Sequence, residues 1–215
     1  MIGSADRGNE LNNLPWAAPA LSLLLGYLLG SIPFGVLLTR LGGAGDLRSV
    51  GSGNIGATNV LRTGRKGLAA LTLLLDMLKG TAAVLVASVL FPGMQEIAAI
   101  GAFVGHLWPV WLGFRGGKGV ATFFGIMVGL HCPSALVYAA AWLLTLAIAR
   151  FSSLAGMAAG LIAPVAAAAL GRFDLALLYL GFALLLFWKH RENIDRLLDG
   201  SEPRVGGHKG AVPHG

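Results

Sequence analysis

The sequence predicts an all-α integral membrane protein that crosses the bilayer several times. Of its 215 residues, 55% are hydrophobic and only 12% are charged, and its mean hydropathy is +0.73. Soluble domains carry roughly 25% charged residues, so this chain has too few to cover a water-exposed globule. Its apolar residues also gather in runs close to the roughly 20 residues that a transmembrane helix needs.

Seven apolar segments are the predicted transmembrane helices. In chain order they are Pro15–Leu38, Leu68–Phe91, Ile97–Leu112, Val120–Leu130, Ser134–Ala149, Leu154–Leu170 and Leu175–Trp188. The third, fourth and seventh are short, so they need flanking residues, tilt or a locally thinner bilayer. The 32 glycines suit such a bundle, because small residues allow transmembrane helices to approach closely. We expect one seven-helix membrane domain over residues 15–198, between a polar N-terminus (1–14) and a tail (199–215).

The lysine and arginine residues predict the orientation of these helices. The loops on one side carry Arg40, Arg48, Arg62, Arg65, Lys66, Arg115, Lys118, Arg150, Lys189, Arg191, Arg196, Arg204 and Lys209. The loops on the other side carry only Arg7 and Arg172. Because Lys and Arg are retained in the cytoplasm, we expect a cytoplasmic C-terminus and, with seven spans, an external N-terminus. The same clusters lack interleaved aromatic residues, so the net charge of +6 does not indicate a nucleic-acid partner.

The first polar segment on the cytoplasmic side, Arg40–Lys66, is predicted to bind phosphate. Its glycine-rich stretch Gly51–Asn59 can turn backbone N–H groups into an anion-binding concavity. Arg62 lies one helical turn beyond Thr58 and can grip a phosphate with two hydrogen bonds. Further side-chain donors are Ser52, Asn54, Thr58 and Asn59. The alternative is a flexible turn whose arginine only sets the topology.

This stretch also matches a dinucleotide-binding pattern, which we reject. Gly51, Gly53 and Gly56 satisfy G-x-G-x-x-G, and Asp76 follows at a suitable distance for a ribose contact. The pattern requires a preceding β-strand and a βαβ unit, whereas here a transmembrane helix precedes it. Asp76 itself lies in the next apolar segment, where Lys79 is three residues away on the same helical face and can neutralise it. Whether that pair is functional or structural stays open.

Two further polar segments lie on the same side. Arg115–Gly119 is not a Walker A motif, because Gly119 replaces the required Ser or Thr, but three glycines around Lys118 make a compact anion site. In Lys189–Arg196, a helix would place Asn193 beside His190. The alternatives are a tight topogenic loop for the first and a solvated helix end for the second. Ser153 follows Arg150 and is either part of a helix cap or a substrate contact.

Together these segments indicate a membrane enzyme or carrier for phosphorylated, lipid-linked substrates. A transporter or flippase is the competing class, but it typically uses inverted repeats and a site near the bilayer midplane, and the sequence suggests neither. His190 and Asp195 also fit the H-x-x-x-x-D pattern of soluble-type glycerolipid acyltransferases. The surroundings of that pair differ from those of the soluble enzymes, so we treat the match as a coincidence.

In order and in topology, four motifs resemble the bacterial acyl-phosphate–glycerol-3-phosphate acyltransferase family, PlsY. They are Gly30–Phe34, Gly51–Asn59, Gly116–Gly119 and Lys189–Ile194, and the resemblance spans about Leu21 to Leu198. It implies a seven-helix fold and transfer of a fatty acyl group from acyl phosphate to the 1-hydroxyl of glycerol 3-phosphate. The products would be lysophosphatidic acid and phosphate, made at the cytoplasmic face of the inner membrane without a cofactor or metal. An enzyme that produces acyl phosphate would be the functional neighbour.

The resemblance also implies roles for individual residues. The implied catalytic residues are Arg62, Lys118, His190 and Asn193. The implied substrate-binding residues are Ser31, Ser52, Gly53, Asn54, Gly56, Thr58, Asn59, Gly116, Gly117, Gly119 and Ser153. Acyl phosphate is an activated anhydride, so the main tasks are to neutralise phosphate, to align the hydroxyl with the carbonyl and to stabilise the oxyanion. The loops other than Arg40–Lys66 are too short to build a surface for acyl carrier protein, and the compact motifs leave no room for coenzyme A, which also favours acyl phosphate as the donor.

Overall fold

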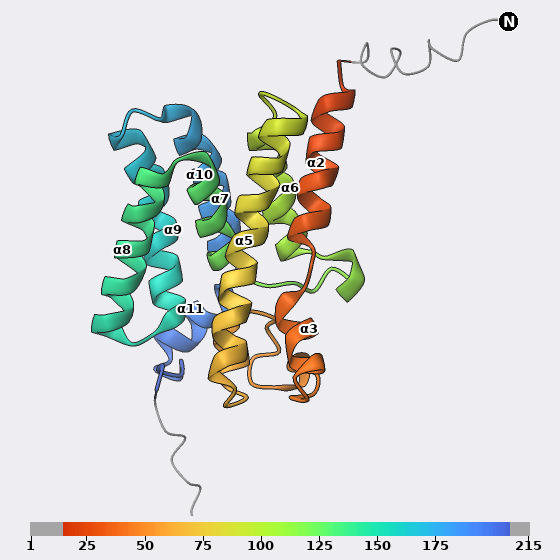
Figure 1. The fold of residues 1–215 in the computed structure, drawn as a ribbon. Helices are drawn as coiled ribbons and strands as arrows, with labels where there is room; N and C mark the ends of the chain where they lie inside the picture. The colour runs from red at the N-terminus through yellow and green to blue at the C-terminus, as the bar shows by residue number, and fades with distance from the viewer. Residues whose placement is uncertain (1–14, 207–215) are drawn as a thin grey trace, which may run out of the picture. The chain divides into compact units, whose positions relative to one another are not determined.

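The computed structural model describes residues 15–206, and all the regular elements in that range are helical. The elements are α2 (Ala17–Gly30), α3 (Phe34–Leu41), η1 (Leu47–Ser49), α4 (Ala57–Leu61), α5 (Lys66–Leu90), α6 (Gln95–Leu107), η2 (Val110–Leu112), α7 (Val120–Leu130), α8 (Cys132–Ala149), α9 (Ser152–Ala169), α10 (Phe173–Lys189) and α11 (Arg191–Leu198) (Figure 1). The predicted external N-terminus, 1–14, and the end of the predicted tail, 207–215, lie outside the described residues. The chain forms two compact units that divide after Ala135, in the first turn of α8.

Each of the seven predicted apolar segments contains a helix, and the first contains two, α2 and α3. Four stretches are long and apolar enough to cross a membrane: Ala17–Leu41, Lys66–Leu90, Cys132–Ala149 and Ser152–Ala169. A fifth results if α10 and α11, which meet at a 58° bend, form one broken span. The predicted shortness of the third and fourth segments is confirmed, since α6 has 13 residues and α7 has 11. Large apolar side chains are exposed on the helices, for example Ile148 on α8 and Leu177 on α10, as expected of a surface that faces lipid.

Glycines allow the helices of the first unit to pack at backbone distance. A Cβ atom at Gly26 of α2 would overlap the backbone of Ala98 in α6, and one at Gly105 of α6 would overlap the backbone of Tyr27. Helices α5 and α7 pack in the same way, because a Cβ at Gly125 would overlap the carbonyl group of Met77. The expected role of small residues in the helix interfaces is therefore confirmed.

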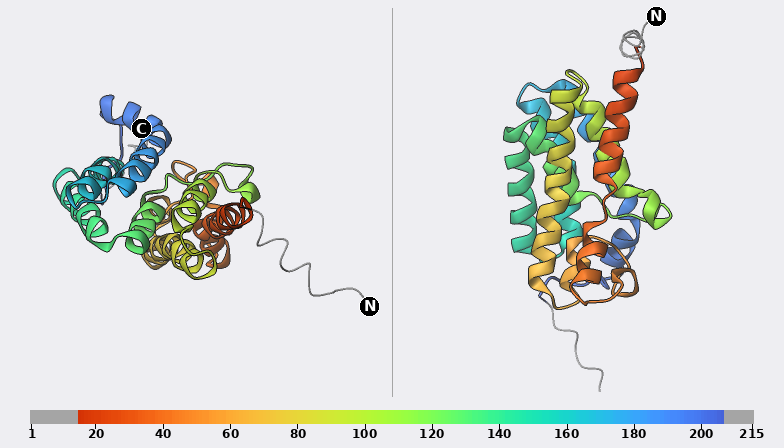
Figure 2. Two further views of the ribbon diagram at one scale, coloured as in Figure 1. Left: turned by 90° about the horizontal axis from the view of Figure 1, so that it is seen from above. Right: turned by 45° about the vertical axis from the view of Figure 1, so that its right-hand side comes forward.

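The break between α2 and α3 is closed by a charged group from α5. Figures 1 and 2 show α5 running alongside both α2 and α3. From α5, the Lys79 Nζ donates to the carbonyl of Ile32, 2.9 Å away, and pairs with the Asp76 carboxylate at 2.6 Å. Both side chains are buried, and the predicted pairing of Asp76 with Lys79 is confirmed. The Ile32 carbonyl at this break thus accepts from the Lys79 ammonium as well as from the backbone N–H of Phe34, 3.1 Å away.

The connection between α3 and α5 folds against the end of α5. Leu47 of η1 and Val60 of α4 are fully buried, and they pack with Ala69 and Leu68 of α5. This small apolar core fixes both ends of the stretch that contains Gly51–Asn59. This packing favours a shaped loop over the alternative of a flexible turn.

In the second unit, α9 packs against α10, and α11 follows α10 directly. Arg150 and Phe151 form the short connection between α8 and α9, with Arg150 in the left-handed region at φ 62°. Two residues after the end of α11, the backbone turns at Gly200, which has a positive φ of 70°. That turn sends residues 201–206 back toward the start of α9, where the chain meets Arg150.

Candidate functional site

Asn59 holds the loop Gly51–Asn59 together from the inside. Its Nδ2 donates to the carbonyls of Leu47, Val50 and Asn54 at 3.1, 2.9 and 2.8 Å, and its Oδ1 accepts from the backbone N–H of Ser52. The side chain is buried and fully engaged within the loop. Asn59 therefore shapes the loop, and its effect on a ligand would pass through that shape.

Several backbone N–H groups of the loop also bond within it. Gly53, at φ 67°, donates to the carbonyl of Val50 at 2.9 Å, and Gly56 donates to the Asn54 Oδ1 at 2.9 Å. By contrast, the side chains of Ser52 and Thr58 are exposed and face no partner in the described structure. The hydroxyl groups are thus the accessible part of this loop.

The arginines of the loop differ in their partners. Asp46 binds the guanidinium groups of Arg48 at 2.7 Å and Arg40 at 3.3 Å. The hydrogen bond from Arg48 holds the pKa of the Asp46 carboxyl well below its usual range. Arg62 is exposed and forms no ion pair with any residue between 15 and 206, while its stem lies against Gly51. Unlike Arg40 and Arg48, Arg62 therefore meets an anionic ligand without a competing carboxylate.

Loop Arg115–Gly119 is fastened to the end of α6. The backbone N–H of Gly116 donates to the Leu107 carbonyl at 3.2 Å, and that of Gly117 donates to the His106 carbonyl at 3.0 Å. Gly117 lies against the His106 ring, and the His106 Nδ1 lies 3.8 Å from the Asp76 carboxylate. These two N–H groups hold the loop in place, so they are engaged before any ligand binds.

Gly119 and Lys118 of this loop face different surroundings. Gly119 precedes α7 with a φ of 87° and lies against the Phe103 ring, a conformation and a space that favour glycine. Lys118 is half-buried between these two glycines. The loop therefore presents one ammonium from a rigid backbone.

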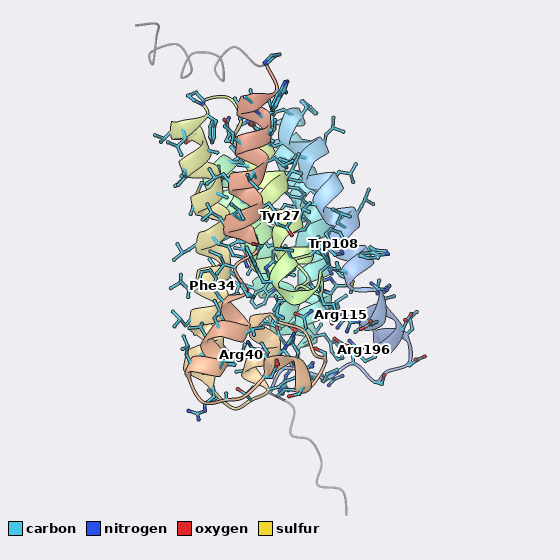
Figure 3. All side chains as sticks on the ribbon, turned by 90° about the vertical axis from the view of Figure 1, so that its right-hand side faces the viewer. Tyr27, Phe34, Arg40, Trp108, Arg115 and Arg196 are labelled. Carbon is cyan, nitrogen blue, oxygen red and sulfur yellow. The ribbon has the colours of Figure 1, made fainter. Side chains whose placement is uncertain are left out.

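Ser31, a predicted binding residue, takes part in fixing the segment before this loop. Its Oγ donates to the Leu28 carbonyl at 2.9 Å and accepts from the Trp111 Nε1 at 2.8 Å. Tyr27, one turn earlier, donates to the Trp108 carbonyl at 2.9 Å, and these two residues lie together in Figure 3. Since the Ser31 side chain is buried, these two hydrogen bonds are those of a structural residue.

In the second unit, the geometry assigns the proton of His190. The buried Nδ1 lies 2.8 Å from the carbonyl oxygen of Leu186. A carbonyl oxygen can only accept, so Nδ1 carries the hydrogen, and a neutral ring has its lone pair on Nε2. Any proton that His190 takes up from a ligand must therefore arrive at Nε2.

Ser153 and Asn193 share a partner that the sequence did not reveal. Ser153 begins α9, Asn193 lies in α11, and both are buried. Each donates to the same oxygen of Glu202, at 2.6 Å. Glu202 lies beyond residue 198, where the predicted membrane domain ends, and the one signal in the sequence is that it is the last acidic residue of the chain.

The comparisons with known proteins agree on one family. The model of the family described as glycerol-3-phosphate acyltransferase matches residues 20–200. A glycerol-3-phosphate acyltransferase of Rhodopseudomonas palustris (strain HaA2) is 58% identical over 190 residues, covering 87% of this chain and 96% of that protein. One from Brucella anthropi is 56% identical over 185 residues, covering 86% and 92%.

Solved structures give the same result. The crystal structure of PlsY, an integral membrane glycerol 3-phosphate acyltransferase, in its glycerol 3-phosphate form has a TM-score of 0.82 and 38% identity, covering 87% of this chain and 96% of that one. The lysophosphatidic acid form gives 0.80 and 35%, with 87% and 95% covered. These relatives decide between the two predicted classes in favour of the enzyme. The chain belongs to the glycerol-3-phosphate acyltransferase family, and it is a membrane acyltransferase of phospholipid synthesis of the PlsY type.

Proposed function

We propose that the enzyme takes its acyl group from acyl phosphate and places it on the 1-hydroxyl of glycerol 3-phosphate. The observation that carries the proposal is the loop Gly51–Asn59, which hydrogen bonds within it hold in shape, with the exposed guanidinium of Arg62 beside it. Solved relatives in glycerol 3-phosphate and lysophosphatidic acid forms support the acceptor and the product. The hydroxyl oxygen bonds to the acyl carbon, the carbon–oxygen bond to phosphate breaks, and the hydroxyl proton ends on the released phosphate.

The proposed roles of the polar residues follow from their surroundings. Arg62 and Lys118 bind phosphate groups through charge-assisted hydrogen bonds, with the hydroxyls of Ser52 and Thr58 as additional donors. Asn54 and Asn59 keep the first loop in shape, together with Gly53 and Gly56. Gly116, Gly117 and Gly119 keep the second loop in shape. In the second unit, the residues that contact substrate are Ser153, His190 and Asn193. His190 makes this contact through Nε2, because its Nδ1 is bonded to the Leu186 carbonyl.

We propose seven spans with an external N-terminus and an active site at the cytoplasmic face of the inner membrane. The asymmetry of lysine and arginine residues supports this orientation. Since acyl phosphate is a reactive anhydride, an enzyme that makes it must supply it at the same membrane. The partners are thus glycerol 3-phosphate, acyl phosphate, membrane lipid and that supplying enzyme.

The donor is tested with the purified protein in detergent. Glycerol 3-phosphate is offered together with palmitoyl phosphate or palmitoyl-CoA, and radiolabelled lysophosphatidate and inorganic phosphate are measured. We expect product from palmitoyl phosphate alone, with phosphate released in equal amount. Protein carrying Arg62→Ala, purified in the same way, controls for a contaminating acyltransferase. Comparable turnover with palmitoyl-CoA, free of contaminating acyl phosphate, would overturn the proposed donor.

A further inference from the structure

The chain after α11 returns and is fastened to the start of α9. The backbone N–H groups of Ser201 and Glu202 donate to the Arg196 carbonyl at 2.8 and 3.0 Å. The Val205 N–H donates to the Arg150 carbonyl at 2.7 Å, and the Arg204 guanidinium lies over the Phe151 ring at 5.3 Å from its centroid. Residues 201–205 therefore have a defined position in the second unit, beyond the residues 20–200 that the family model matches.

This return places the carboxylate of Glu202 among three donors. Its Oε1 accepts from the Ser153 Oγ and the Asn193 Nδ2, both at 2.6 Å, and its Oε2 accepts from the Arg196 Nε at 2.7 Å. Only 8% of Glu202 is exposed to solvent. Burying a carboxylate costs free energy unless donors such as these bond to it. The three hydrogen bonds therefore hold the carboxylate in place, and the carboxylate in turn fixes the orientation of the three donor side chains.

The charge of Glu202 determines the direction of these hydrogen bonds. Burial raises the pKa of the Glu202 carboxyl, but the hydrogen bonds from Ser153, Asn193 and Arg196 outweigh burial and hold the pKa below its ordinary value. The group is therefore ionised at neutral pH, and an ionised carboxylate can only accept. Ser153 and Asn193 must be the donors in both contacts.

The direction of these bonds limits what the two residues can offer a ligand. A serine hydroxyl has one hydrogen, and Ser153 gives it to Glu202, so any contact from Ser153 to a ligand uses an oxygen lone pair. The amide of Asn193 gives its Nδ2 hydrogen to Glu202, and the other polar atom of that amide, Oδ1, can only accept. Both residues are then acceptors toward a ligand. Phosphate oxygens of an anion are acceptors as well, whereas a hydroxyl group can donate.

We propose that Glu202 is a positioning residue that fixes Ser153 and Asn193 as acceptors for the neighbouring hydroxyl groups of glycerol 3-phosphate. The Ser153 hydroxyl and the Asn193 amide both donate to the same carboxylate oxygen, so the two groups lie close together, as the hydroxyls on carbons 1 and 2 of the substrate do. The identity of the ligand rests on the proposed function, while the acceptor character rests on the hydrogen bonds. In the competing interpretation, Glu202 only stabilises the fold or occupies an anion site.

The test compares two acceptor substrates in one preparation. Propane-1,3-diol monophosphate keeps the phosphate and the reactive hydroxyl of glycerol 3-phosphate but lacks the hydroxyl on carbon 2. We expect the wild-type enzyme to prefer glycerol 3-phosphate by about tenfold or more in kcat/KM, because a site built to pair a hydroxyl discriminates against its absence. In Glu202→Gln, the preference should fall to about threefold or less. An amide cannot accept from Ser153, Asn193 and Arg196 at once, so the two acceptors lose their fixed direction.

The controls separate positioning from stability. A partly unfolded preparation lowers the rates with both substrates equally and leaves their ratio unchanged. Glu192→Gln, at an exposed acidic position of the same helix α11, should keep the wild-type ratio. Ser153→Ala removes one acceptor directly and should lower the ratio as Glu202→Gln does. This variant decides the question if Glu202→Gln is not recovered from the membrane.

Three outcomes would overturn the proposal. One is a wild-type enzyme without preference, and another is a variant whose preference is unchanged while both rates fall. The third is tighter binding of glycerol 3-phosphate in Glu202→Gln, which would mean that the carboxylate merely occupies an anion site. Isothermal titration calorimetry with each substrate, without any donor, measures the same preference independently. An enzyme inactive with acyl phosphate would contradict the proposed donor, while the calorimetric ratio would still decide the role of Glu202.

Discussion

Arg62 and Arg40 carry the same charge on the same loop, yet their surroundings differ. Arg40 shares the Asp46 carboxylate with Arg48, whereas Arg62 is exposed and has no ion pair between residues 15 and 206. A salt-bridged arginine already has its anion, so of Arg40 and Arg62 it is Arg62 that is poised for a phosphate. The sequence alone could not separate these two arginines, because both lie in one cation-rich loop.

This difference predicts how alanine substitutions act. Arg62→Ala should lower kcat/KM for glycerol 3-phosphate by about tenfold or more, since a charge-assisted contact contributes about 1.5–3 kcal/mol. Lys118→Ala should have a similar effect. Arg40→Ala, the matched control, should stay within about twofold, because Arg48 still binds Asp46. Near-normal kinetics of the Arg62 variant in folded protein would return Arg62 to a purely topogenic role.

Gly117 gives a second prediction at the scale of the residue. A Cβ at this position would overlap the ring of His106, which lies beside the buried pair of Asp76 and Lys79. The ring has little room to move, so Gly117→Ala should displace the loop that carries Lys118 and lower kcat/KM by about tenfold or more. Gly67→Ala is the control, because a Cβ at Gly67 meets no atom within 4 Å. Equal activity of the two variants would contradict the proposed role of this contact.

At the scale of the element, glycines decide how closely the helices pack. Gly125 of α7 lies against the backbone of Met77 in α5, so even one methyl group must push the helices apart. Gly181 of α10 has open space around it. The pattern of glycines in the sequence indicated close packing but not which glycines carry it, because both positions lie in similar apolar helices.

Thermal unfolding in detergent tests this contrast. Gly125→Ala should lower stability by about 1–3 kcal/mol, the usual effect of overpacking, and it should lower Tm accordingly. Gly181→Ala should leave Tm unchanged or raise it slightly, because alanine favours a helix over glycine. A Gly125 variant as stable as the wild type would show that α5 and α7 can separate without loss.

At the scale of the whole molecule, the orientation across the membrane is the main prediction. With an external N-terminus, the chain crosses back and forth so that Cys132 lies outside and Ser49 lies inside. Cys132 is exposed and is the single cysteine of the chain. An impermeant maleimide should therefore label the native protein on intact cells. Ser49→Cys in a Cys132→Ala background should be labelled only after the cells are permeabilised, and the reverse pattern would invert the topology.

By itself, the sequence determined the membrane class, the positions of the apolar helices and the polar segments that carry the family's motifs. These features depend on composition and on patterns within a few residues, which the chain order displays directly. The family resemblance followed from the same local motifs and is confirmed by the comparisons. The seven-span count and the orientation rest on the same patterns and remain predictions.

The tertiary structure alone decided which polar groups are already engaged. Ser31 bonds Trp111, which is 80 residues away, and Ser153 bonds Glu202, which is 49 residues away. Asn59 and Gly117 are likewise turned inward to hold their loops, although the sequence suggested that they face a ligand. A hydrogen bond depends on the distance and direction between two atoms, and for distant residues only the folded chain sets both.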